Sequence, residues 1–296
     1  MDSEIWIGVD IGGTAIKAGS VRSDGSVVKQ LSTPIELAQG HERVLDQIAE
    51  LVTELGGTSC LGVGCAGLID RPAGSVSESP NLGALVGAPL VDGIASRLDL
   101  PPAAVLLEND ANVAALGEQW QGAAQGVDDT LVVTLGTGIG GGLILGGRLY
   151  SGPRGMAGEV GHLVMIPGLG DASSGPGILE RLSSATAARQ RARDAGLTED
   201  LEALCATARE SAGPESRLLH EIGVDLGRGL GSVEALLDIE VFVFAGGFSP
   251  ALDVLEPGIH EGMAERRFGT RQAQLRRASL GGNAGWIGAA RLAGLS

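Results

Sequence analysis

The stretch that decides the fold is Ile5-Trp6-Ile7-Gly8-Val9-Asp10-Ile11-Gly12-Gly13-Thr14, near the start of the chain. Its first five residues are mostly β-branched and apolar, which predicts a buried strand. The two glycines that follow predict a tight turn, because glycine tolerates positive φ and lets a ligand approach the backbone closely. Successive N–H groups and the Thr14 hydroxyl of such a turn can face phosphate oxygens. A plain hairpin turn would use the same residues, so both interpretations stay open at this point.

Outward from this turn, the chain predicts an antiparallel meander followed by mixed elements. Residues 15–21 and 27–33 are apolar, β-rich runs, and Asp24-Gly25 between them is a strong hairpin signal. Helices are predicted where apolar residues recur at helical spacing, and strands where they form short runs. The predicted helices cover 41–55, 86–98 and 111–120, and the predicted strands cover 60–65 and 104–107.

The opening order of strand, glycine turn and hairpin occurs again near residue 130. Residues 129–135 predict a strand, residues 136–142 hold five glycines, and residues 143–150 predict a hairpin. This weak internal duplication predicts an α/β protein whose two similar halves face each other across a cleft. We place the boundary between residues 121 and 122, in a small and polar segment. The first domain would cover 1–121 and a larger second domain 122–284, with a terminal helix over 285–296.

Glycines at two further places could hold a nucleotide. The run Gly136-Thr137-Gly138-Ile139-Gly140-Gly141-Gly142 matches neither a P-loop nor a dinucleotide-binding fingerprint. Together with the opening turn, it predicts two N–H-lined cradles that grip a polyphosphate across the cleft. Gly246-Gly247 follows a predicted strand over 241–245 and would let a flat adenosine lie against the backbone. The same dipeptide could simply form the turn before Pro250.

Bulk composition excludes several classes of function. The 296 residues carry a formal net charge of −15 with only two lysines, and such a surface repels nucleic acid and anionic membranes. The three cysteines, at 60, 65 and 205, have neither metal-type nor disulfide-type spacing and fit a reducing compartment. No signal peptide and no apolar run long enough to cross a bilayer are visible. We therefore predict a cytoplasmic protein that binds neither nucleic acid nor membrane.

Acidic residues at element ends are the candidates for chemistry. Asp110 follows the predicted strand 104–107 and can take a proton from a substrate hydroxyl, or cap the next helix, or both. Asn109 beside it offers a donor and an acceptor. Residues 154–162 predict a tight glycine loop that brings Glu159 near His162, a pair suited to a polyol-binding wall, although a lone histidine is more often merely packed. Asp10 could orient a hydrated Mg²⁺ between phosphates.

In their order along the chain, these motifs resemble those of the ROK family of sugar kinases, repressors and related proteins, within the actin-like ATPase superfamily. The resemblance rests on six motifs in register, at residues 10–14, 79–81, 108–112, 135–142, 157–162 and 245–247. It implies two actin-like (ribonuclease H-like) α/β domains, with the terminal helix 285–296 packing back on the first. It also implies a homodimer that uses ATP and Mg²⁺ to phosphorylate a small-molecule sugar.

The resemblance implies a role for each candidate residue. Asp110 would be the general base. The residues that would contact sugar hydroxyls are Asn81, Asn109, Glu159, His162 and Glu180. The residues that would hold phosphates are Gly12, Gly13, Thr14, Gly136, Thr137 and Gly138, with Asp10 reaching the magnesium ion through water. Gly246 and Gly247 would contact the adenosine.

Two departures from the family pattern stand out. Typical members follow the Gly-His pair with a loop of the form C-x-C-G-x-x-G-C-x-E, whose three cysteines and histidine bind a structural zinc. Residues 169–180 of this chain are LGDASSGPGILE, which keeps Glu180 but has no cysteine. Because a thiolate zinc site needs those sulfurs, we predict no zinc and a loop held by ordinary packing. The second departure is Cys65-Ala66-Gly67, where many relatives carry Pro-Gly, and it could alter the sugar pocket.

The implied reaction is transfer of the ATP γ-phosphoryl group to a hexose or aminohexose hydroxyl, with O6 as the expected acceptor. Glucose is the family's commonest substrate, but mannose, fructose, N-acetylmannosamine and kanosamine stay open. A repressor would carry a helix-turn-helix ahead of the first motif, where this sequence has only residues 1–4. A non-catalytic sugar-sensing or regulatory protein is the other alternative, suggested by the missing cysteines. The intact Asp110 and both phosphate motifs favour the kinase.

Overall fold

The computed structural model describes residues 4–168, 175–267, 269–270 and 272–296, and it contains two five-stranded sheets of the same design. The strand orders are β3-β2-β1-β4-β7 and β10-β9-β8-β11-β12. In each sheet the first three strands form an antiparallel meander and the remaining pairs are parallel. The duplication that the sequence indicates is therefore confirmed. The strands are β1 (Ile5–Ile11), β2 (Ala15–Arg22), β3 (Val27–Pro34), β4 (Leu61–Cys65), β7 (Val105–Asn109), β8 (Thr130–Leu135), β9 (Ile139–Leu145), β10 (Arg148–Leu149), β11 (Val241–Ala245) and β12 (Gln274–Arg277).

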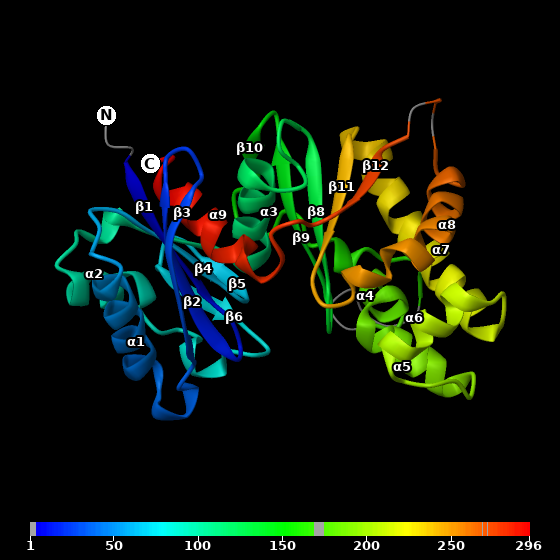
Figure 1. Cartoon of the computed structure of the whole chain (residues 1–296), viewed down its shortest axis with the longest axis horizontal. Helices are drawn as coiled ribbons and strands as arrows, with labels where there is room; N and C mark the ends of the chain where they lie inside the picture. The colour runs from blue at the N-terminus through cyan, green and yellow to red at the C-terminus, as the bar shows by residue number, and fades with distance from the viewer. Residues whose placement is uncertain (1–3, 169–174, 268, 271) are drawn as a thin grey trace.

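The helices form layers around and between the two sheets (Figure 1). Helices α1 and α2 cover the outer face of the first sheet, α3 and α9 lie between the sheets, and α4 to α8 cover the far side of the second sheet. Within the described ranges, none of these helices has both the length and the apolar character that a membrane span requires. The helices are α1 (His41–Glu54), α2 (Leu90–Leu98), α3 (Asp110–Gln121), α4 (Leu179–Ser183), α5 (Ala185–Asp194), α6 (Leu201–Glu210), α7 (Pro214–Leu237), α8 (Leu252–Ala264) and α9 (Ala284–Ala293).

A row of three glycines explains how the terminal helix packs on the first sheet. Gly8 of β1 is in register with Gly19 of β2 and with Gly62 of β4, so the three form a strip without side chains. A Cβ atom at Gly8 would lie 2.0 Å from the carbonyl oxygen of Trp286, and one at Gly62 would lie 1.8 Å from that of Ala289. Helix α9 can therefore lie backbone-to-backbone on β1 and β4. The division of the chain between residues 121 and 122 stays a prediction.

Several predicted boundaries differ from the structure. The helix expected over 86–98 begins only at Leu90, because Gly87 has a φ of +73° and Pro89 is the N-cap residue. Sequence patterns also missed the short hairpin of β5 (Leu68–Asp70) and β6 (Ser75–Glu78), whose strands are too short to show a period. In the glycine run 136–142, strand β9 begins at Ile139, so only residues 136–138 form a turn.

The chain crosses between the two sheets twice, and one buried side chain holds both crossings. Glu118 near the end of α3 is fully buried. Its carboxylate accepts hydrogen bonds from the N–H groups of Ala123 (2.8 Å), Ser279 (3.1 Å) and Leu280 (2.9 Å). Ala123 follows α3 on the outward crossing, and the other two precede α9 on the return. The crossings are therefore fastened to each other through a single carboxylate.

Candidate active site

The carboxyl ends of three neighbouring strands bring the acidic candidates together. In the register of the first sheet, Ile11 of β1 lies beside Cys65 of β4, which lies beside Asn109 of β7. Asp10 and Asp110 flank this line, one on β1 and the other at the start of α3. Because parallel strands end at the same edge, the two carboxyl groups lie near enough for Asp110 to raise the pKa of Asp10. The structure thus places the predicted base beside the predicted magnesium partner.

The helix cap at this edge is Asn109 and not Asp110. The Asn109 Oδ1 atom accepts hydrogen bonds from the N–H groups of Ala111 (2.9 Å) and Asn112 (3.2 Å), and its Nδ2 donates to the carbonyl of Gly67 (2.9 Å). The interpretation of Asp110 as the N-cap is therefore wrong. It sits in the first helical turn instead, where burial raises the pKa of its carboxyl against the hydrogen bonds that lower it.

Glu108, in the same motif, fixes the residues on either side of Asp110 through hydrogen bonds. The sequence alone assigns it no role. Its side chain is only 3% exposed. Its Oε1 accepts from the N–H of Asn109 and from the side chain of Asn112, both at 2.9 Å. Its Oε2 accepts from Arg71, which also donates to Ser151 in the second half of the chain. Nothing in the sequence around Arg71 signals this bridge, because it joins segments that are far apart.

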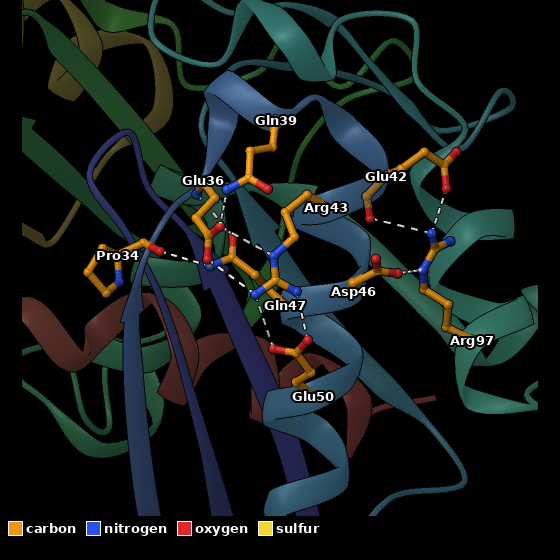
Figure 2. A network of polar contacts seen from close by, with 9 residues as sticks. All are labelled: Pro34, Glu36, Gln39, Glu42, Arg43, Asp46, Gln47, Glu50 and Arg97. Carbon is orange, nitrogen blue, oxygen red and sulfur yellow. Dashed lines mark hydrogen bonds and ion pairs between the residues drawn. The ribbon is translucent and has the colours of Figure 1, made fainter.

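A polar network around Gln47 holds the chain after β3 (Figure 2), and this part of the chain hydrogen-bonds to the first glycine turn, residues 12–14. The buried Gln47 donates to the carbonyl of Pro34 at 2.8 Å and accepts from the N–H of Glu36 at 3.0 Å. Between them, Ile35 donates its N–H to the carbonyl of Thr14 at 3.2 Å. On the other side, a Cβ atom at Gly13 would lie 3.2 Å from the Asn81 side chain. The predicted phosphate and sugar residues are neighbours here.

Asp10 faces the start of α9. A Cβ atom at Gly285 would lie 2.4 Å from its carboxylate, so the glycine makes room for it. Burial, and then the charge of Asp110, raise the pKa of Asp10 to about 6, while Lys17 lowers it. Lys17 itself donates to the carbonyl of Gly282 at 2.9 Å. A carboxyl group that burial keeps partly protonated is one that a cation would ionise on binding.

The second glycine turn, residues 136–138, joins β8 to β9 in the second sheet. The later glycines of the run pack against α3: a Cβ atom at Gly142 would lie 2.3 Å from the carbonyl oxygen of Ala111. The expectation that the whole run serves a phosphate is thus too broad, since part of it makes helix packing possible. Gly246 has a φ of +86°, and a Cβ atom there would lie 2.3 Å from the carbonyl oxygen of Leu135 at the end of β8. A Cβ atom at Gly247 would meet nothing within 4 Å. Gly247 is thus the more open of the two toward a ligand.

Glu159 lies within electrostatic reach of His162, Asp110 and Glu180. The His162 Nε2 and Glu159 Oε2 atoms are 3.9 Å apart. Burial raises the pKa of Glu159, His162 lowers it, and the charges of Asp110 and Glu180 raise it. Glu180 also accepts the N–H of Ile139 at 2.9 Å, a contact that its sequence context does not indicate. Their proposed contacts with a sugar stay predictions. The first half of the altered loop, residues 169–174, lies outside the described residues.

Replacing Asp10 with asparagine should stabilise the ligand-free, magnesium-free protein at neutral pH. The folded pKa of about 6 lies above the ordinary value of 3.8. The free energy of unfolding that the protonated Asp10 contributes is therefore fully present below pH 3.8. It is lost as the pH rises through about 6. The neutral amide avoids this loss, so Asp10→Asn should raise the melting temperature by a few degrees at pH 7.5 and by less at pH 5.

Thermal unfolding followed by circular dichroism measures this effect. Asp24→Asn is the matched control, because the N–H of Ser26 lowers the pKa of that exposed carboxylate and its loss should slightly destabilise the protein at neutral pH. Equal gains for Asp10→Asn at both pH values would show that its titration is not the cause.

A model of the ROK family matches residues 6–295. A glucokinase of Thermotoga maritima is 35% identical over 268 residues, which is 84% of each chain. A glucokinase of Streptomyces coelicolor is 33% identical over 98% of this chain and 97% of its own. An N-acetylmannosamine kinase of Escherichia coli O157:H7 is 29% identical over 81% of this chain and 82% of its own.

Solved structures agree with these relatives. A ROK family glucokinase from Streptomyces griseus, in complex with glucose and AMPPNP, is 32% identical with a TM-score of 0.78, over 99% of this chain and 100% of its own. A ROK hexokinase from Thermus thermophilus is 33% identical with a TM-score of 0.87, over 99% of this chain and 98% of its own. The expected α/β fold of the actin-like ATPases is thereby confirmed. Because the family model matches nearly the whole length and relatives of 33–35% identity cover 84% or more of this chain, the chain belongs to the ROK family.

Proposed function

We propose that this chain is an ATP-dependent sugar kinase that transfers the γ-phosphoryl group to a hexose or aminohexose hydroxyl, with O6 as the acceptor. The observation that carries the proposal is the position of Asp110. Its partly buried carboxyl lies within electrostatic reach of Asp10 on one side and Glu159 on the other. A base between a phosphate-side carboxylate and a sugar-side carboxylate is where a hydroxyl must lose its proton in this reaction.

Each part of the site has a role in this reaction. Phosphoryl transfer needs mainly positioning and neutralisation of charge. The N–H groups of the two glycine turns, residues 12–14 and 136–138, would bind phosphate oxygens, and Gly246 and Gly247 the adenosine. Asp110 would accept the hydroxyl proton as the sugar oxygen bonds to phosphorus and the bond to ADP breaks. The residues that would orient the sugar are Asn81, Asn109, Glu159, His162 and Glu180.

The carboxyl groups at the edge fit a magnesium ion that arrives with ATP. Asp110 raises the pKa of Asp10 and Lys17 lowers it only in part, so the two carboxyl groups keep the negative potential that a cation between them and the phosphates would neutralise. Three acidic, histidine or cysteine side chains that could hold a metal alone are not found together in the described part of the chain. Mg²⁺ usually keeps waters and binds through substrate phosphates, and it supplies charge neutralisation there. Asp10 would hold such an ion through water.

A panel of sugars with ATP tests the proposal. We expect ADP release with glucose or with an aminohexose such as N-acetylmannosamine or kanosamine, measured by a coupled assay. For the sugar that reacts, its 6-deoxy analogue is the matched control and should bind without turnover if O6 is the acceptor. Turnover of the 6-deoxy analogue would overturn the O6 assignment. Sugar binding by calorimetry with no ADP release from any sugar would instead favour the sugar-sensing alternative, which the missing zinc cysteines suggest.

Assembly and location are further proposals. We infer a homodimer from the family resemblance, and a cytoplasmic protein without nucleic-acid partners from the net charge of −15 and the sparse cysteines. Light scattering at two concentrations measures the first, and a monomer at both would contradict it.

A further inference from the structure

The second glycine turn and the first residue of β9 are held by α4 and the start of α5. Ala185 donates its N–H to the carbonyl of Gly136 at 2.9 Å, and the Thr186 hydroxyl donates to the carbonyl of Thr137 at 2.7 Å. The Glu180 carboxylate accepts the N–H of Ile139 at 2.9 Å. The first two contacts occupy carbonyl oxygens, and the third occupies an N–H. The turn is therefore shaped by residues that follow the loop on the predicted sugar side.

The donors that this arrangement leaves available define where an anion would bind. In the part of the chain that the structure describes, the N–H groups of Thr137 and Gly138 have no hydrogen-bond partner. The next N–H, that of Ile139, is occupied by Glu180. The carboxylate also lies against Gly138, where a Cβ atom would be 2.2 Å from its Oε2. A phosphate that binds the two available N–H groups would therefore have a negative side chain as its immediate neighbour.

We propose that Glu180 is a positioning residue that makes nucleotide binding depend on the sugar. Without sugar, its carboxylate stays on the Ile139 N–H and repels the phosphate. With sugar bound, hydroxyl groups donate to the carboxylate, draw it from the turn and release a third N–H for the phosphate. This inference rests on the proposed function, because it takes Glu180 as a sugar-contacting carboxylate.

Elementary electrostatics gives the coupling its sign and size. Two like charges a few ångströms apart at a partly solvated site repel by an amount that changes an equilibrium constant on the order of tenfold or more. Releasing a backbone N–H to the phosphate acts in the same direction. Since coupling between two ligands is reciprocal, the nucleotide must tighten sugar binding by the same factor.

Calorimetric titration with Mg²⁺·AMPPNP, with and without the sugar that the panel identifies, tests this inference. Wild type should bind the nucleotide more tightly with sugar present. Glu180→Gln removes the charge at constant shape, so its sugar-free affinity should rise on the order of tenfold and the sugar should tighten it much less. Unchanged or weaker sugar-free affinity in Glu180→Gln would overturn the inference.

Two further variants separate the proposed role from general effects. Glu202→Gln makes the same charge change at an exposed position in the first turn of α6, and its sugar-free nucleotide affinity should stay close to wild type. Thr186→Val removes the hydroxyl that holds Thr137, so it should weaken nucleotide binding with and without sugar, and Thr186→Ser should restore it. An equal gain in Glu202→Gln and Glu180→Gln would mean that the net charge of the protein, and not the contact with Ile139, sets the affinity.

The sugar-free titration keeps this test separate from the proposed function. It needs no phosphorylated sugar, so it can succeed even if the panel finds no substrate. Conversely, if the protein is an active kinase and Glu180→Gln leaves the sugar-free nucleotide affinity unchanged, this inference is wrong and the proposed function stands. Melting curves of all four variants confirm that each is folded before its affinity is interpreted.

Discussion

Asp110→Asn should lower kcat by a factor of about 10²–10⁴ while the KM values for sugar and ATP change little, the usual result of losing a general base. The amide keeps the shape of the side chain but cannot take the hydroxyl proton. Folding should be preserved, because Asn109 and not Asp110 caps helix α3. Steady-state kinetics with the active sugar measures the effect. Asp92→Asn, a change of the same kind on the exposed side of α2, is the control and should leave kcat unaltered.

The pH profile offers an independent check on the same residue. Burial raises the pKa of Asp110 above its ordinary range. Because the base must be ionised, kcat should fall as the pH drops through that raised pKa, at a pH higher than an exposed aspartate would give. The residual activity of Asp110→Asn should lack this acidic limb. Near-normal turnover in the variant, or an unchanged limb, would exclude Asp110 as the base.

Gly288→Ala should destabilise the whole protein by more than about 3 kcal/mol, the upper end of what one extra methyl group costs in a packed interior. A Cβ atom at Gly288 of α9 would lie 1.6 Å from the carbonyl oxygen of Val113 in α3. The obstacle is backbone, so the two helices must move apart. Since α3 begins at Asp110, activity should fall together with stability.

Urea denaturation of wild type and of Gly288→Ala measures this loss in the free energy of unfolding. Gly83→Ala is the matched control, because a Cβ atom there would meet nothing within 4 Å and the glycine has no positive φ. It should unfold at nearly the wild-type midpoint. A Gly288→Ala midpoint equal to that of the control would mean that α3 and α9 are not held as closely as the structure shows.

The sequence predicts the architecture well where local patterns carry it. The meander after Ile5 and its repeat after residue 129 have strong turn signals, and both occur in the sheets as expected. Asp110 is predicted as the base because it follows a strand, which is a local clue. Its exact place in the helix was not found, since Asn109 and Asp110 are both good caps and only the geometry decides between them.

Contacts between distant segments explain what sequence analysis missed. Arg71 meets Glu108 and Ser151 across the fold, and Glu118 reaches N–H groups more than 150 positions away. No periodic pattern in the sequence predicts such contacts. The sequence also does not reveal the role of every glycine. Those at 8 and 62 make room for helix α9 and not for a ligand. A glycine that makes room for a helix looks the same in a sequence as one that makes room for a phosphate.

The strip formed by Gly8, Gly19 and Gly62 has a consequence for how the protein is made. Its cover, α9, begins only at Ala284, far along the chain from the end of β4 at Cys65, so during synthesis the first sheet emerges well before the helix that packs on this face. A premature stop before Ala284 would thus leave the half made first without its cover.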